Sequence, residues 1–427
     1  ILTVILFLWY YHYMAKLVKK NVLIIGSSAK EYALASKFSS YDMVGEVFVA
    51  PGNGRIAEVA KCVDIREDCP QQLLAFALKN DVYLTIASSD KSIKADTAGF
   101  FQANDQLIFA PAAAGAQFAL SRATAKKFMY KLHIPTPKFG VFEKEQLALD
   151  YVKNSPMPIV IGPDELNDTS VISACSTVKL ARTCVSDLFL QNEPRIVIED
   201  YTYGPAFTFY VITDGYHVLP VMPVRDYKFL ENGDGGLLTP GTGGFAPDYK
   251  VTAGIVENIM QNVRNMLSSL EKRENPYLGI LGIDCVMTDA DKFVTLGFTP
   301  FLKDHHAQIV IDLLDENLFT LFEACAVGSF ADDYETIKLN GLSGVSAVLY
   351  SRAAGNVVTG IELLDDETTL TPFNIYKNEY MEYVTQKGRN FVLTQTASTL
   401  SRARELLYDD IDSVNFDGKK FRTDICN

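Results

Sequence analysis

The stretch NVLIIGSSAKEYALASKF at residues 21–38 decides the fold class of this chain. Its apolar run at 22–25 ends at Gly26, and residues 30–38 then carry apolar side chains at helical spacing. A continuous apolar strand that leads through a short turn into a helix is typical of a parallel sheet covered by helices. We therefore expect an α/β fold with ligands at the carboxyl ends of its strands.

The same pattern is repeated downstream. The apolar run 47–50 leads into the turn PGNG at 51–54, and the run 83–87 ends in the polar residues 88–90. Polar turn residues at the carboxyl end of an apolar run are typical of strands in such a sheet. Both runs are therefore expected to extend it.

After residue 111 the pattern changes. Residues 121–132 have the spacing of a helix capped by Ser121, and an antiparallel pair is expected at 207–212 and 217–221. The segment 231–247 contains six glycines and is interpreted as a long polar loop, which can bring backbone N–H groups close to a ligand or act as a mobile lid. Further elements are expected in this order: a strand at 196–200, a helix at 251–271, strands at 281–287 and 293–298, a helix at 308–327, strands at 345–350 and 391–394, and a helix at 398–410.

Length and composition limit the function classes. At 427 residues the chain is too long for one ordinary core, so roughly two to four packed units are expected. A net charge of -13, with no run of basic residues longer than a pair, argues against a nucleic-acid backbone as partner. The cysteines are scattered without C-x-x-C spacing, which favours reduced thiols in a cytoplasmic protein over disulfides or a zinc site.

The first segment, ILTVILFLWYYHY at residues 1–13, is strongly apolar. It is shorter than the roughly 20 residues that a membrane-spanning helix needs. The sequence MAKLVKKNVLIIG from Met14 resembles a natural cytosolic start, so we expect residues 1–20 to lie outside the fold. The alternative, a signal-type segment, lacks a basic stretch before it and a cleavage site of small residues after it.

The strand and turn VFVAPGN at 47–53 and the run FDGKKFRTDI at 416–425 carry a family resemblance. With the segments between them, they make the chain similar to phosphoribosylamine-glycine ligase over almost all of residues 21–425. Arg422 and Asp424 match the family's closing R-x-D-I signature, or only stabilise this part of the chain as an ion pair. The resemblance implies an ATP-grasp fold with a Rossmann-like N-terminal domain at 21–112, an ATP-grasp domain at 113–330 with a lid at about 121–192, and a small α+β or β-rich capping domain at 331–427.

The turn GSSAKEYAL at 26–34 follows the family pattern G-N-G-G-R-E-H-A-L in outline. In the family this turn and the loop at 51–53 hold phosphoribosylamine. Lysine replaces the arginine here, and it cannot reproduce the planar fork of arginine on a phosphate. The family's third-strand motif G-P-E-A-P-L is SSDKSI at 88–93. The resemblance implies the following substrate contacts: Gly26, Lys30, Glu31, Gly52 and Asn53.

The resemblance also implies a nucleotide site and an acceptor site. Nucleotide contacts are expected from the strand end Glu199-Asp200-Tyr201 and from Arg122, which replaces a family lysine. Asp226 and Lys228 are either ligand contacts or a surface ion pair of little energetic weight. The remaining contacts near the acceptor are expected from Gly243, Gly244 and Asp304.

The residues that hold magnesium in the family differ in this chain. The family motif E-F-N-x-R-F-G-D-P-E is GFTPFLKDHH at 297–306, so the glutamate and the asparagine become Gly297 and Thr299. Magnesium needs hard oxygen ligands, and the sequence argues against a magnesium site, whereas ATP stays the implied cofactor. We also expect no new metal site from Asp304, His305 and His306, because adjacent histidines on a helix or strand point apart.

The family's flap K-A-D-G-L-A-A-G-K-G-V is GPDELNDTSV at 162–171. It contains no lysine, no glycine after Gly162, and three carboxylates that we expect to face the position of a polyphosphate. Phosphoryl transfer depends on positive charge and on precise positioning of the phosphates. This end of the expected site has therefore lost cations.

Two functional hypotheses follow. By resemblance the chain is an ATP-dependent, ADP-forming ligase of purine biosynthesis that joins glycine to 5-phosphoribosylamine through a glycyl phosphate. The alternative is a non-catalytic relative that keeps a nucleotide or ribose-phosphate pocket for binding, regulation or assembly with a protein partner. The substitutions cluster where the reaction occurs, which favours the alternative. The expected partners are small molecules, with neither nucleic acid nor membrane.

Overall fold

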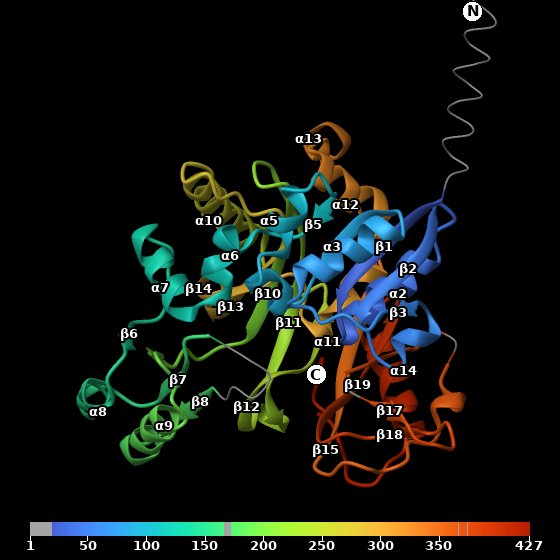
Figure 1. Cartoon of the computed structure of the whole chain (residues 1–427). Coiled ribbons are helices and arrows are strands. Elements are labelled where there is room, and N and C mark those ends of the chain that lie inside the picture. Colours follow the sequence, from blue (N-terminus) through green and yellow to red (C-terminus); the bar gives the residue numbers. More distant parts are fainter. Residues whose placement is uncertain (1–18, 166–171, 366, 374) are drawn as a thin grey trace, which may run out of the picture.

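Figure 1 shows the computed structural model of the chain, which describes residues 19–165, 172–365, 367–373 and 375–427. The apolar segment 1–13 and the flap residues 166–171 lie outside these ranges, so the predictions made for them stay predictions. None of the described helices is long and apolar enough to cross a membrane.

The N-terminal part is a five-stranded parallel sheet in the order β3-β2-β1-β4-β5. The apolar run at 22–25 forms the buried centre of β1, which confirms the predicted parallel α/β architecture. Helix α2 follows Ser28, whose backbone N–H donates to Oε2 of Glu31 at 2.8 Å. The bounds are β1 (Lys20–Gly26), α2 (Ala29–Ser39), β2 (Val44–Pro51), the 3-10 helix η1 (Ile56–Glu58), β3 (Lys61–Cys62), α3 (Pro70–Lys79), β4 (Val82–Ala87), α4 (Asp90–Lys94), α5 (Thr97–Gln102) and β5 (Ile108–Phe109).

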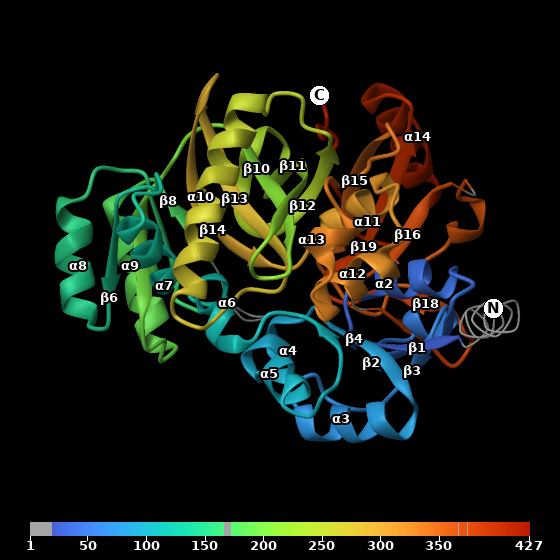
Figure 2. The same cartoon turned by 90° about the horizontal axis from the view of Figure 1, so that it is seen from above.

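The next part contains a four-stranded antiparallel sheet in the order β6-β9-β7-β8, which lies at the left in Figures 1 and 2. Apolar side chains of α8 and α9 share one core cluster with this sheet. Helix α7 begins after the predicted cap Ser121, whose hydroxyl accepts a hydrogen bond from the N–H of Thr124 at 3.0 Å. The bounds are α6 (Ala113–Leu120), α7 (Arg122–Lys131), β6 (Phe139–Phe142), α8 (Glu145–Asn154), β7 (Ile159–Pro163), β8 (Ser173–Cys175), α9 (Val178–Leu190) and β9 (Ile196–Asp200).

A nine-stranded antiparallel sheet follows the order β14-β13-β10-β11-β12-β15-β19-β16, with β20 paired to β15. The hairpin β10–β11 is the predicted antiparallel pair, and strands from the last hundred residues continue the same sheet. The bounds are β10 (Ala206–Thr213), β11 (Val218–Glu231), β12 (Gly235–Ala246), β13 (Gly279–Asp289), β14 (Lys292–Pro300), β15 (Ser343–Ser351), β16 (Thr369–Pro372), β19 (Gly388–Ala397) and β20 (Lys419–Lys420), while β17 (Tyr376–Lys377) and β18 (Tyr383–Val384) pair separately.

The prediction of a long polar loop at 231–247 is wrong, because most of this segment is β12. This strand pairs with β11 on one side and with β15 on the other. Glycine usually weakens a strand, but it permits close approach of another backbone. A Cβ on Gly243 would lie 2.4 Å from the carbonyl oxygen of Ser346, so the packing here requires glycine.

The helix predicted at 308–327 is in fact two helices, α11 (Asp304–Leu313) and α12 (Leu318–Val327). Oδ1 of Asn317 accepts hydrogen bonds from the N–H groups of Phe319 and Thr320 at 2.9 and 3.2 Å and caps α12. Side chains of β1, α2, β10, α11 and α12 share one apolar cluster, which joins the parallel sheet to the nine-stranded sheet. The remaining helices are η2 (Asn232–Asp234), α10 (Ala253–Glu271), α13 (Phe330–Asp333), η3 (Ile361–Leu363) and α14 (Leu400–Ser413).

Candidate functional site

Three charged side chains meet where α7 begins and β9 ends: Arg122, Lys126 and Glu199, here termed the α7–β9 cluster. Arg122 donates to Oε1 of Glu199 at 2.8 Å, and Nζ of Lys126 lies 2.5 Å from Oε2. Burial alone would raise the pKa of the Glu199 carboxyl, but the charges of Lys126 and Arg122 outweigh burial and hold that pKa below its usual value. The cluster thus contains two cations and one carboxylate.

The guanidinium of Arg122 also fills the space beside Gly162. It donates to the carbonyl oxygen of Pro163 at 3.0 Å, and a Cβ added to Gly162 would lie only 2.7 Å from its Nη1. Gly162 stands where the family flap begins with lysine. Arg122 therefore supplies a cation next to the position of that missing side chain.

Asp164 does not face the position expected for a polyphosphate. Its Oδ1 accepts hydrogen bonds from Oγ of Ser121 at 2.8 Å and from the N–H of Ala123 at 2.7 Å, and its Oδ2 pairs with Arg195 at 3.0 Å. A carboxylate at a helix N-terminus is stabilised by the helix dipole. The expectation of three facing carboxylates is therefore wrong for Asp164. Glu165 is exposed and lies 3.3 Å from Nζ of Lys94, and Asp168 lies outside the described residues.

Asp200 and Tyr201 continue the chain at the end of β9. Both are partly exposed, and the ring of Tyr201 packs edge-on against Tyr203 with the centroids 4.8 Å apart. The four predicted nucleotide contacts, Arg122, Glu199, Asp200 and Tyr201, therefore gather at one strand end.

A second charged group lies where β10, β11 and β13 meet the start of α11: Lys303, Asp226 and Asp284, here termed the Lys303 cluster. Nζ of Lys303 lies 2.8 Å from Oδ2 of Asp226, 2.5 Å from Oδ1 of Asp284 and 2.9 Å from Oγ1 of Thr208. Burial alone would raise the pKa of both carboxyls. The Lys303 charge outweighs burial, so the pKa of Asp284 is below its usual value and that of Asp226 is well below it.

Gly297 and Thr299, which replace the family's magnesium ligands, lie on β14 beside this cluster. Gly297 is the register partner of Asp284, and the hydroxyl of Thr299 donates to Oδ2 of Asp284 at 2.9 Å. Both oxygens of Asp284 are thus engaged, one by Lys303 and the other by Thr299. The residues present do not fit the oxygen-rich, near-octahedral site that magnesium requires.

Asp226 is not half of a surface ion pair, and that interpretation is wrong. Its side chain is fully buried in β11, and Nζ of Lys228 lies 3.7 Å from its Oδ2. Gly244 of β12 is its register partner, and Gly243 lies opposite Tyr227. Three of the residues predicted near the acceptor, Asp226, Lys228 and Gly244, are therefore neighbours.

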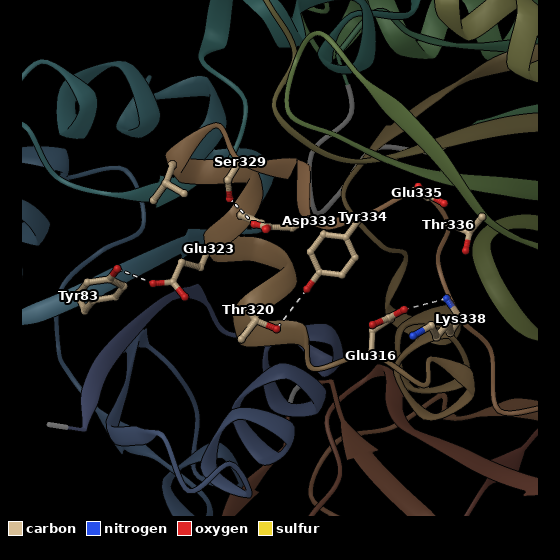
Figure 3. A pocket seen from close by; sticks show the side chains of 12 residues that line it. Tyr83, Glu316, Thr320, Glu323, Ser329, Asp333, Tyr334, Glu335, Thr336 and Lys338 are labelled. Carbon is tan, nitrogen blue, oxygen red and sulfur yellow. Dashed lines mark hydrogen bonds between the residues drawn. The ribbon is translucent and has the colours of Figure 1, made fainter. Parts of the chain in front are cut away.

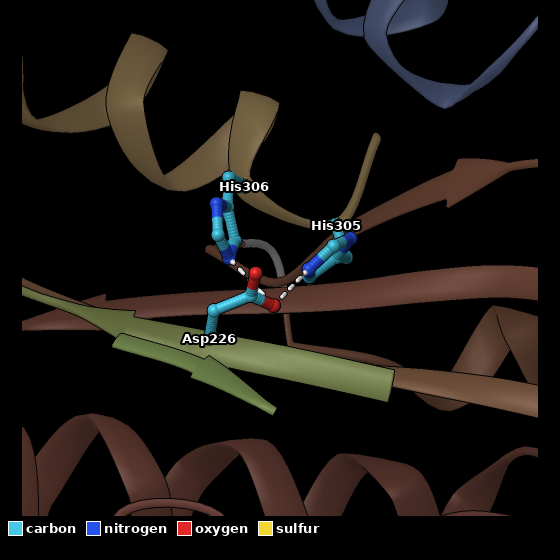
Figure 4. Close-up of side chains that lie close together, drawn as sticks. All are labelled: Asp226, His305 and His306. Carbon is cyan, nitrogen blue, oxygen red and sulfur yellow. Dashed lines mark hydrogen bonds and ion pairs between the residues drawn. The ribbon is translucent and has the colours of Figure 1, made fainter. Parts of the chain in front are cut away.

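His305 and His306 converge on Asp226, as Figure 4 shows. Their Nε2 atoms lie 2.9 and 3.6 Å from Oδ1 of Asp226, and the ring centroids are 4.1 Å apart. The expectation that these adjacent histidines point apart is wrong. They lie in the first turn of α11 against β12, where a Cβ on Gly241 or Gly244 would come within 1.9 or 2.9 Å of an imidazole atom, so glycine leaves room for both rings.

Asp304 turns away from the histidines toward the parallel sheet. Its Oδ1 accepts from Oγ of Ser28 at 2.5 Å and lies 3.8 Å from Nζ of Lys30. Burial alone would lower the pKa of the Lys30 ammonium, but Asp304 and Glu31 raise it above its usual value.

The predicted phosphoribosylamine contacts surround the carboxyl ends of β1 and β2. The N–H of Gly52 donates to the carbonyl oxygen of Gly26 at 3.1 Å, and the amide of Asn53 donates to that of Ser27 at 2.8 Å. The structure therefore brings together the five residues predicted for this site and adds Asp304: Gly26, Lys30, Glu31, Gly52 and Asn53.

Several residues of these sites were missed by sequence reasoning. Lys126 could have been found, because it follows Arg122 by four residues on the same helical face. Ser28 also had a signal, because it begins an S-x-x-E capping box with Glu31. No signal in the sequence identifies Asp284 and Lys303, because their pairing depends on the register of β13 and on the start of α11.

Arg422 and Asp424 form an ion pair with two contacts, at 2.7 and 2.6 Å. Arg422 also donates to Oδ1 of Asp234 at 2.8 Å and is almost fully buried. The pair therefore fastens the C-terminal run to η2.

A pocket of about 690 Å³ lies between β4, α12 and α13, and Figure 3 shows the side chains that line it. Tyr83, Thr320, Glu323, Tyr334 and Lys338 are among the side chains that line it. The described residues predicted for substrate and nucleotide contact do not line this cavity.

Comparison with known protein families divides the chain near residue 119. The phosphoribosylglycinamide synthetase N domain matches residues 20–119, and the ATP-grasp (A) domain of that synthetase matches residues 120–304. The chain is 30% identical to the phosphoribosylamine-glycine ligase of Halalkalibacterium halodurans over 418 residues, which cover 95% of this chain and 96% of that protein. It is 28% identical to the ligase of Neisseria meningitidis serogroup A over 419 residues, which cover 95% of this chain and 99% of that protein.

Solved structures agree on the fold. The phosphoribosylamine-glycine ligase of Thermotoga maritima superposes with a TM-score of 0.79 at 22% identity, covering 95% of this chain and all of that one. A second similar structure is the biotin carboxylase domain of the Hydrogenobacter thermophilus 2-oxoglutarate carboxylase, solved with MgADP and bicarbonate. It superposes with a TM-score of 0.72 at 12% identity and covers 95% of this chain and 92% of that one. The mixed α/β architecture is thus an ATP-grasp fold.

Proposed function

This chain belongs to the phosphoribosylamine-glycine ligase family of purine biosynthesis, and we propose that it is a nucleotide-binding member that has lost phosphoryl transfer. It binds ATP or ADP at the end of β9 and does not form glycyl phosphate. The observation that carries this proposal is the Lys303 ammonium, held by Asp226 and Asp284 beside Gly297 and Thr299.

The nucleotide half of the proposal rests on the α7–β9 cluster. Its two cations exceed its one carboxylate, and Asp200 and Tyr201 are partly exposed at the same strand end. A related ATP-grasp domain was solved with MgADP, and the shared fold supports an adenine nucleotide here. The proposed contacts are Arg122, Glu199, Asp200 and Tyr201.

The loss of catalysis follows from electrostatics at the Lys303 cluster. Lys303 already holds one oxygen of Asp226 at 2.8 Å and one of Asp284 at 2.5 Å, and Thr299 holds the other oxygen of Asp284 at 2.9 Å. Gly297 adds no oxygen ligand, so the oxygen-rich set that magnesium needs is missing here. We infer that no magnesium bridges the phosphates, and phosphoryl transfer without that charge compensation is slow.

The turn at the ends of β1 and β2 is proposed as a retained ribose-phosphate pocket. Lys30 supplies its cation, while Gly52 and Asn53 supply backbone and amide groups. Because Asp304 and Glu31 already neutralise Lys30, binding of an anion there should be weak.

Calorimetry and a coupled assay test the proposal together. ADP and ATP are titrated into the protein with and without Mg²⁺, and ADP release is followed with glycine and phosphoribosylamine. We expect saturable nucleotide binding that Mg²⁺ does not strengthen, and no ADP release that requires both substrates. ADP release that requires both would establish the ligase instead, and an absence of nucleotide binding would reject the nucleotide half of the proposal.

A further inference from the structure

A cluster of possible metal ligands shares Asp226 with the Lys303 cluster but includes neither Gly297 nor Thr299, the positions where the family holds magnesium. Asp226, His305 and His306 each offer one ligand atom, and these atoms all lie within 4.8 Å of one another. All three side chains are buried, with exposures of 0 to 1%. The carboxylate projects from β11 and both rings project from α11, so the ligands converge from opposite sides (Figure 4).

Two nitrogens in this cluster, Nδ1 of His305 and Nε2 of His306, lack the hydrogen bond that burial requires. The hydroxyl of Tyr210 accepts from the backbone N–H of Lys303 at 3.2 Å and lies 2.9 Å from Nδ1 of His306, so that nitrogen has a hydrogen-bond partner in either tautomer. Nε2 of His306 has no hydrogen-bond partner among the described residues, and Oδ1 of Asp226 is 3.6 Å away. An unsatisfied buried polar atom is costly, so a group that pairs with it is expected.

The surroundings hold the three ligands in position as outer-shell partners do in metal sites. Tyr210 orients His306, and Lys303 holds the second oxygen of Asp226 at 2.8 Å. Gly241 and Gly244 pack directly against the rings, so neither imidazole can swing toward β12.

We propose that Oδ1 of Asp226 and the Nε2 atoms of His305 and His306 bind one divalent transition-metal ion of the zinc type. Imidazole nitrogens select zinc, cobalt or nickel over magnesium, whose ligands are oxygens. On binding, each imidazole keeps its single proton but carries it on Nδ1, and that of His306 then donates to Oη of Tyr210. The ion replaces the hydrogen bond between His305 and Asp226.

The charges around the ion predict its fourth ligand. The carboxylates of Asp226 and Asp284 are already balanced by the ammonium groups of Lys303 and Lys228. The ion therefore adds two positive charges that these side chains do not offset. We expect an anion in the fourth position, where three-ligand zinc sites hold water or substrate, and a hydroxide there offsets one of the two charges.

Cobalt spectroscopy tests the site in the full chain. Chelator-treated protein is titrated with Co²⁺ and then competed with Zn²⁺, and one equivalent with tetrahedral visible absorption and nitrogen and oxygen ligation is expected. His305→Gln and His306→Gln should each weaken affinity by more than about 100-fold, beyond the loss typical for an outer-shell partner. His217→Gln is the matched control, because it removes an exposed imidazole that lies 3.2 Å from a single carboxylate, Asp214.

Circular dichroism checks that each variant is folded, and the wild-type spectrum decides the question even where a variant fails. A lack of saturable Co²⁺ binding would overturn the proposal. So would a thiolate-to-cobalt absorption band that Cys62→Ser abolishes, because Cys62 is exposed and could capture the ion at the surface. The proposal would also be overturned if both histidine variants fold and bind Co²⁺ with wild-type affinity.

Discussion

The α7–β9 cluster and the Lys303 cluster differ in how their charges are balanced. The first holds two cations on one carboxylate, Glu199, and the second holds one cation between two carboxylates, Asp226 and Asp284. The first cluster therefore has one cation more than it has carboxylates, next to Asp200 at the end of β9. The second has no such excess, because Lys303 is held by both of its carboxylates, one of which also lies 3.7 Å from Lys228.

This difference shows that the fold and the chemistry depend on different residues. On β14, Phe298 is buried and remains the register partner of buried Ile283 on β13, so the strand pairs normally. Its neighbours Gly297 and Thr299 face the Lys303 cluster and have lost the family's ligand groups. Apolar packing keeps the sheet intact while the polar face of the same strand changes.

The largest effect is expected from Lys303→Met, which removes the cation from its cluster. Asp226 and Asp284 then become buried charges without their main partner, and breaking a buried pair costs about 3–5 kcal/mol. Urea denaturation at pH 7 should show a loss of unfolding free energy of this size. Lys228→Met is the matched control, because its Nζ is 3.7 Å from the same carboxylate and partly exposed, so its loss should stay below about 1 kcal/mol.

The loss of unfolding free energy in Lys303→Met should depend on pH in a defined direction. The pKa values of Asp226 and Asp284 are lowered in the folded protein, so their stabilisation is present above the unfolded pKa of about 3.9 and is lost as pH falls through the folded values. The gap in unfolding free energy between wild type and Lys303→Met should therefore be largest near neutral pH and shrink as the pH falls, beginning above about pH 4 because the unpaired buried carboxyls of the variant take up protons first. A gap that is constant with pH would mean that Lys303 acts through packing.

The second effect concerns the excess charge of the α7–β9 cluster. Arg122→Ala removes the guanidinium that we propose contacts the nucleotide, and hydrogen bonds to charged groups contribute about 1.5–3 kcal/mol. ADP affinity measured by calorimetry should fall by about 10- to 150-fold. Lys127→Ala removes an exposed charge from the same helix and should leave affinity nearly unchanged. Equal losses of ADP affinity in both variants would mean that Arg122 acts only through its charge and makes no specific contact with the nucleotide.

The third effect is expected when the family's two magnesium ligands are restored beside the Lys303 cluster. Gly297→Glu with Thr299→Asn adds a carboxylate and an amide oxygen, and a Cβ at residue 297 meets no heavy atom within 4 Å among the described residues. We expect Mg²⁺ to strengthen ADP binding about tenfold in this variant, equal to about 1.4 kcal/mol. Gly297→Gln with Thr299→Asn has the same shape without the carboxylate and should respond less. An unchanged response in both would show that Lys303 still excludes the ion.

Much of the fold could be predicted from the sequence, because local patterns specify it. The buried run at 22–25, the cap Ser121 and the hairpin at 206–231 lie where periodicity and turn residues indicate. The prediction for the segment 231–247 failed because tertiary contacts determine its structure. Its glycines resemble those of a loop, but they permit contact with β15 and with the rings of α11.

The candidate site was less predictable, because its key contacts join residues far apart in the chain. Family motifs located Arg122, Glu199 and Asp226, yet no local pattern brings Lys303 to Asp284. The convergence of His305 and His306 was missed because the rule for adjacent side chains describes a regular helix, whereas these residues occupy its first turn against glycine-rich β12.

The smallest effect tests whether the α7–β9 cluster depends on its helix. Ser121→Ala removes the cap that accepts from Thr124 and donates to Asp164, and loss of such a cap costs about 1 kcal/mol. Thr399→Ala removes the equivalent cap of α14, where Oγ1 accepts from the N–H of Arg402 at 3.3 Å. Both variants should lose similar unfolding free energy in urea. Only Ser121→Ala should also weaken ADP binding, because Arg122 is the next residue and takes its position from that turn. If both caps leave ADP affinity unchanged, the cluster is held by Glu199 and Lys126 rather than by the helix start.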